Sequence, residues 1–135
     1  MKVRCVAYRA SDLPAEIRER AKLEDDYAFR ISVGKIYTVY AVSVFRYGLW
    51  YCICNDGYVH FPAWTPAGLF QIEDPGISRY WTFAAINDKD ITCTLAYPEW
   101  ARDETDYYDE LVENMDPAVE IWNKYKKLID EEADG

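Results

Sequence analysis

The change of residue pattern that most constrains the fold lies at Pro98. From Tyr27 to Tyr97 apolar and polar residues alternate, and Val, Ile, Tyr, Phe and Trp are frequent, which is typical of β-strands. After Pro98 the apolar residues recur three and four positions apart, which is typical of one face of a helix. Because 135 residues without a repeat or linker carry both patterns, we expect a single domain over 1–135.

This change of period predicts an α+β fold. Residues 1–97 are expected to form a small antiparallel curled sheet or an SH3-like barrel, with helices from residues 98–135 packed on it. Pro62 and Pro66 have no amide hydrogen for a central strand, so their segment is expected at a sheet edge or in a loop. The expected strands span residues 2–9, 36–46, 49–55, 58–62, 69–72, 78–86 and 90–98.

Helices are expected in three places. A short one lies within the charged segment 11–26, and one or two more lie within 98–114. The clearest spans 116–133, where Asp116 is a suitable N-cap and Pro117 suits the first helical position. Its apolar stripe consists of Ala118, Ile121, Trp122, Tyr125, Leu128 and Ile129.

The alternation within the strands also predicts the core. Four cysteines lie in apolar, strand-like surroundings, where a reduced cysteine behaves as a small hydrophobic residue. Most of the tryptophans are expected to be at least partly buried, because each ring removes a large apolar area from water. The strand positions expected in the core are Tyr37, Val39, Leu49, Tyr51, Ile53, Phe70 and Ile72.

The charge is concentrated in the helical part. Residues 1–97 hold 11 Lys/Arg and 11 Asp/Glu, whereas residues 98–135 hold 4 Lys/Arg and 13 Asp/Glu, which accounts for the whole net charge of −9. Such a chain is a poor partner for nucleic acid, whose phosphates need a basic surface. No apolar run is long enough to span a membrane, and no secretion signal is visible, so we expect a cytoplasmic protein that binds no membrane.

The motifs of common enzymes are absent from the sequence. No Gly-rich turn flanks a nucleophile, there is no phosphate-binding loop, and His60 is the only histidine. Cys52, Cys54 and His60 lack the spacing of a zinc site, so core cysteines and an edge histidine are the favoured interpretation. We therefore expect a non-enzymatic protein without cofactor or metal. A small enzyme that uses His60 and carboxylates remains the less favoured alternative.

Two surfaces are candidates for binding. One is the acidic, aromatic stretch after Pro98, since aromatic anchors surrounded by charge are common in protein interfaces; in the competing interpretation Trp100 and Tyr107 pack the helices on the sheet and the acids are merely solvated. The other is the proline-bounded edge that carries His60 and Trp64. The residues expected to bind a basic protein partner are Trp100, Asp103, Glu104, Asp106, Tyr107, Tyr108, Asp109 and Glu110.

Several motifs resemble those of a family of small bacterial proteins that are mostly uncharacterised. They are VGKIYTVYAV (33–42), LWYCICND (49–56), FPAWTPAGLFQIED (61–74) and SRYWTF (78–83), followed by Glu99-Trp100 and an acidic tail. Small acidic single-domain proteins of this kind are similar to the immunity proteins of polymorphic toxin systems. That resemblance implies a protein that binds and neutralises a toxin domain. The alternative is a small-ligand-binding or regulatory SH3-like module at the His60/Trp64 edge.

Overall fold

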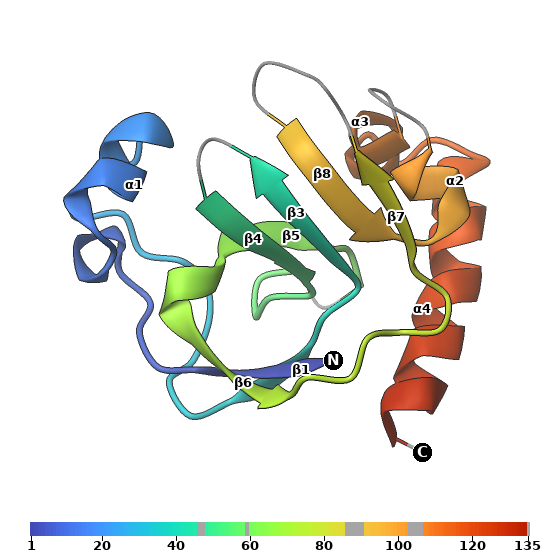
Figure 1. Ribbon diagram of the computed structural model, residues 1–135, viewed down its shortest axis with the longest axis horizontal. Helices are drawn as coiled ribbons and strands as arrows, with labels where there is room; N and C mark the ends of the chain where they lie inside the picture. The colour runs from blue at the N-terminus through green and yellow to red at the C-terminus, as the bar shows by residue number, and fades with distance from the viewer. Residues whose placement is uncertain (46–47, 59, 86–90, 103–106, 135) are drawn as a thin grey trace.

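The computed structural model (Figure 1) describes residues 1–45, 48–58, 60–85, 91–102 and 107–134. Within these ranges the chain forms two antiparallel sheets and four helices, which confirms the α+β class. In chain order the elements are β1 (Lys2–Cys5), η1 (Ala10–Asp12), α1 (Ala15–Arg20), β2 (Ile36–Thr38), β3 (Ala41–Phe45), β4 (Gly48–Ile53), β5 (Ala63–Pro66), η2 (Ala67–Leu69), β6 (Phe70–Asp74), β7 (Thr82–Ala85), β8 (Ile91–Ala96), α2 (Pro98–Ala101), α3 (Tyr107–Val112) and α4 (Ala118–Asp134).

The stretch expected to be one strand over 36–46 forms two strands, β2 in one sheet and β3 in the other. The smaller sheet has the order β2-β1-β6 and the larger one the order β5-β4-β3-β8-β7. The amide of Val39 donates to the carbonyl of Met1, whereas the amide of Tyr40 donates to that of Cys52. The chain therefore passes from one sheet to the other between these two residues. The described strands do not close into an SH3-like barrel, so the curled-sheet alternative describes the molecule better.

The strand expected over 58–62 is wrong, because the chain returns to the sheet only at Ala63. The Oδ1 atom of Asn55 accepts hydrogen bonds from the amides of Gly57 and Tyr58, both at 2.9 Å, which forms a tight turn after β4. β5 then pairs with β4 at the outer edge of the five-stranded sheet. The edge location of this proline-bounded segment is confirmed, since an edge strand tolerates Pro66.

A first hydrophobic core, the inter-sheet core, fills the space between the two sheets. It contains five of the seven expected core positions, which are Tyr37, Val39, Tyr51, Ile53 and Phe70. The other two were predicted wrongly, since Leu49 is 43% exposed and Ile72 54% exposed. Leu49 lies at the end of β4 that projects beyond the small sheet (Figure 1), and Ile72 lies on the edge strand β6, whose residues after Phe70 are all exposed.

A second core, the helical core, lies between the five-stranded sheet and the helices. α4 runs along one side of the molecule, opposite α1 (Figure 1), and contributes five of the six residues of its predicted apolar stripe. Ala118, Trp122 and Ile129 are buried and Ile121 and Tyr125 are partly buried, whereas Leu128 is not part of this core. α4 begins at Ala118, one residue after the predicted first helical position Pro117. α2 and α3 are the short helices expected within 98–114.

Candidate functional site

The loop between β4 and β5 is fastened to α4 by a tryptophan. The indole Nε1 of Trp122 donates a hydrogen bond of 2.8 Å to the carbonyl of His60, and the Trp122 side chain is fully buried. At the start of the same loop the amide of Tyr58 donates to the side chain of Asn55, and Tyr58 is 59% exposed. The loop is therefore held at two points, and Tyr58 projects into solvent between them.

A buried chain of hydroxyl groups holds α3 against the rest of the helical core. The hydroxyl of Tyr107 donates to the carbonyl of Ala118 at 2.9 Å and lies 2.6 Å from the hydroxyl of Tyr97, which consequently donates to it. Burial raises the pKa of Tyr107 to about 12, so this hydroxyl remains a donor at physiological pH. These contacts fix the position of α3 relative to the sheet.

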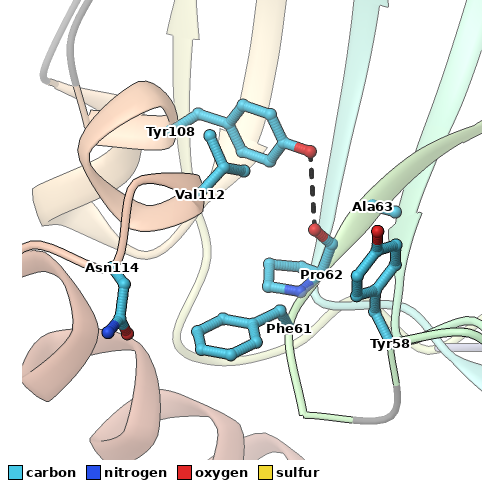
Figure 2. A pocket seen from close by; sticks show the side chains of 7 residues that line it. All are labelled: Tyr58, Phe61, Pro62, Ala63, Tyr108, Val112 and Asn114. Atoms are coloured by element: carbon cyan, nitrogen blue, oxygen red, sulfur yellow. Dashed lines mark hydrogen bonds between the residues drawn. The ribbon is translucent and has the colours of Figure 1, made fainter.

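A cleft of about 540 Å³ separates α3 from the β4–β5 loop. Figure 2 shows the Tyr108 and Val112 side chains on one side and Phe61 and Pro62 on the other. The hydroxyl of Tyr108 donates to the carbonyl of Pro62 at 3.4 Å across one end of the cleft. Tyr58, Ala63 and Asn114 complete the lining, which is predominantly apolar.

The predicted partner-binding residues divide into two groups. Trp100 and Tyr107 are buried in the helical core, where the Trp100 ring packs 5.6 Å from that of Tyr97 and 5.5 Å from that of Tyr107. They pack the helices, as the competing interpretation holds, and offer little surface to a partner. Tyr108 is half-buried in the cleft, Asp109 is exposed and Glu110 is half-exposed, while Asp103, Glu104 and Asp106 lie outside the described residues.

The two candidate surfaces that the sequence left as alternatives meet in the structure. The half-buried ring of Trp64 lies 5.6 Å from that of Trp100 and 6.0 Å from that of Tyr108. The His60 side chain is exposed, whereas its carbonyl takes part in the loop anchor described above. Trp64 thus packs against Tyr108, which lines the cleft, but Trp64 is not itself part of the cleft lining.

A run of acidic residues follows Tyr108 in the sequence, and none of them has an ion-pair partner among the described residues. Between residues 107 and 123 there are five Asp or Glu residues and no Lys or Arg. The seven ion pairs among the described residues all lie elsewhere in the chain, for example between Asp56 and Lys35 or Glu132 and Arg79. The five acids are Asp109, Glu110, Glu113, Asp116 and Glu120.

Cys52 and Cys54, two of the four cysteines, have protonated thiols. Burial raises the pKa of the Cys54 thiol to about 12, and the buried Cys52 thiol is raised as well, so neither is a reactive thiolate at neutral pH. Within the described ranges no three His, Cys, Asp or Glu residues are grouped so as to hold a metal ion. Among the same residues, no helix combines the length and the apolar character needed to cross a membrane.

The sequence did not identify Tyr58, Phe61, Val112 and Asn114 as residues of the site. Val112 is the last residue of α3, and Asn114, two residues later, has a φ of 60°, a conformation that Asn tolerates after a helix. An Asn at such a position is visible in the sequence, but it does not indicate a cleft. Comparisons with family models, with curated proteins and with solved structures found no match. The case for a function therefore depends on the cleft and on the acids beside it.

Proposed function

We propose that this chain is a non-enzymatic binding protein whose partner is a basic protein. The partner would dock on the acidic cleft face, which we define as the cleft together with Asp109, Glu110, Glu113, Asp116 and Glu120. The observation that carries the proposal is that these five acids have no ion-pair partner among the described residues, although seven ion pairs form elsewhere. Acids beside an apolar cleft offer a partner both negative charge and a hydrophobic site for one of its apolar side chains.

Physical reasoning favours a binding role for such a surface. Like charges close together repel one another and destabilise the folded state, so an uncompensated cluster benefits the fold little. A basic partner would relieve that repulsion, and complementary charge accelerates encounter and selects against wrong partners. The apolar side chains of the cleft would supply the uncharged centre that protein interfaces commonly have.

An immunity protein is the specific role that we propose. Toxin domains that act on nucleic acid or nucleotides need basic clefts, which an acidic binding protein can cover. The net charge of −9 in a small chain of 135 residues suits that task in the cytoplasm. The resemblance of small acidic single-domain proteins as a class to immunity proteins also supports this role.

The decisive experiment uses the toxin domain encoded by a neighbouring gene as the partner. Its affinity for the chain is measured against salt concentration for the wild type and for the triple variant D109K/E110K/E113K. We expect an affinity loss of at least tenfold and a weaker salt dependence. A matched control, E19K/E24K/D26K, reverses three acids near α1 and should keep wild-type affinity; equal behaviour of both variants would contradict the proposal.

A small-ligand-binding module at the His60/Trp64 edge is the second candidate. The cleft of about 540 Å³ lies within the range of roughly 300–1,000 Å³ that is usual for small-molecule sites, and Trp64 packs against Tyr108 in its lining. A screen of small aromatic and aliphatic compounds by ligand-detected NMR tests this role. Hits that still bind a folded Trp64→Ala variant with unchanged affinity would count against it.

A further inference from the structure

The first step concerns how a partner segment reaches the site, and it rests on the proposed function. β5 is an edge strand, so a partner strand added to it would be the simplest mode of binding. Pro62 and Pro66, however, have no amide hydrogen to donate, and the carbonyl of Pro62 already accepts the hydroxyl of Tyr108. This edge is blunted against strand addition, as natural sheet edges often are. A partner must therefore bind through its side chains.

The second step concerns what the cleft accepts. Its walls are the apolar groups of Phe61, Pro62 and Val112, and Tyr58 flanks it from the loop (Figure 2). Val112 is 54% exposed, an unusual exposure for a valine that faces a concave, largely apolar surface. An apolar side chain from a partner would remove these walls from water, which favours binding by about 25 cal/mol for each Å² of apolar surface buried.

The third step concerns the charges beside the cleft. Tyr108 and Val112 are four residues apart and so lie on the same face of α3, toward the cleft. Asp109 and Glu113 follow them by one residue each, and both are exposed. Glu113 directly follows the last residue of α3, and its amide donates to the carbonyl of Asp109 at 3.0 Å, so the helical turn continues to it. The two acids therefore form a second row about 100° further around the helix and are about 6 Å apart along its axis.

We infer that the cleft binds one apolar side chain of the partner that is flanked in its own sequence by Lys or Arg. The apolar side chain enters between Val112 and Phe61. The flanking cations face the row formed by Asp109 and Glu113. Recognition thus requires both parts, and neither a purely basic nor a purely apolar segment satisfies the site.

Three short peptides test this inference on the full chain without knowledge of the natural partner. They are acetylated, amidated pentapeptides with the sequences Lys-Lys-Phe-Lys-Lys, Lys-Lys-Gly-Lys-Lys and Glu-Glu-Phe-Glu-Glu. Amide shifts in two-dimensional NMR report the binding. We expect the first peptide to shift the signals of Tyr58, Ala63 and Val112, to bind at least fivefold more tightly than the second, and the third not to bind.

Variants separate the two proposals. Val112→Ser changes an exposed wall residue and should weaken the first peptide at least threefold, while the matched control Val33→Ser, on an exposed valine outside the cleft lining, should not. Equal binding of the first two peptides, or no effect of Val112→Ser, would overturn the anchor inference and leave the acidic partner surface standing. Unchanged binding of the first peptide to D109K/E110K/E113K would instead overturn the electrostatic basis of the proposed function.

Discussion

The inter-sheet core and the helical core use different side chains on the two faces of one sheet. Between the sheets, branched aliphatic residues such as Val3, Val39, Val42 and Ile53 pack together with the rings of Tyr37, Tyr51, Phe70 and Trp81. Under the helices the sheet presents small residues, Ala41, Cys52 and Ala96, and the helices fill the space with aromatic rings. The comparison teaches that the helical core depends on polar groups of its aromatics, which must all find partners when buried.

The acids of the molecule are also of two kinds, because some are compensated by nearby cations and hydrogen-bond donors and others are not. In the sheet-rich part Asp56 accepts hydrogen bonds from Ser32, Lys35 and Tyr37, so its charge is compensated. In the helical part the acids that follow the cleft have no such partners among the described residues. The first arrangement serves the fold, and the second leaves charge available to a partner.

The largest effect is expected when the anchor of the helical core is removed. Trp122→Ala deletes a fully buried ring that packs 5.0 Å from Tyr40 and donates to the His60 carbonyl. The free energy of unfolding should fall by about 3–5 kcal/mol in urea titrations.

Leu69→Ala is the matched change in the inter-sheet core and should cost about 2–5 kcal/mol. Since both cores share the five-stranded sheet, each variant should still unfold in a single transition. Two separate transitions in either variant would show that the two cores are independent units.

A smaller effect is expected from Tyr107→Phe, which keeps the ring and removes one hydroxyl. The buried carbonyl of Ala118 and the hydroxyl of Tyr97 would each lose a partner, at a cost of about 1–3 kcal/mol. Tyr27→Phe, on an exposed ring, is the control and should change the unfolding free energy by less than about 0.5 kcal/mol. Equal stability of both variants would mean that the hydroxyl chain does not hold α3.

Much of the fold could be predicted from the sequence, but the candidate site could not. Periodicity identified α4 and five of seven core positions, because local patterns follow from burial on one face. The failures, Leu49 and Ile72, lie where a strand passes beyond its covering layer or at a sheet edge, which only tertiary structure determines. The convergence of Trp64 with Tyr108 likewise depends on contacts between residues more than forty positions apart.

The paired acid of the sheet-rich part should make stability depend on pH. Burial acts to raise the pKa of Asp56, but hydrogen bonds from Lys35, Ser32 and Tyr37 together hold it below its ordinary value. Because the folded pKa is the lower one, the contribution is complete above the unfolded pKa of about 3.9 and is lost as pH falls through the folded pKa. Asp56→Asn should therefore cost roughly 1 kcal/mol at pH 7 and progressively less below about pH 4. A pH-independent difference in urea titrations would contradict this.

The smallest effect, and the one of opposite sign, is expected at an unpaired acid beside the cleft. Glu113 follows the last residue of α3 and lies four positions after Asp109, so it faces both the negative end of a helix and a like charge. Glu113→Gln should raise the unfolding free energy by about 0.2–0.5 kcal/mol at low salt, and the gain should vanish at high salt. Glu73→Gln removes the partner of Arg4 and should instead lower stability slightly. If Glu113→Gln loses as much stability as Glu73→Gln, Glu113 belongs with the acids that stabilise the fold. If Glu113→Gln instead gains a little stability and binds the Lys-Lys-Phe-Lys-Lys peptide more weakly, the charge of Glu113 is retained for a partner at the expense of stability.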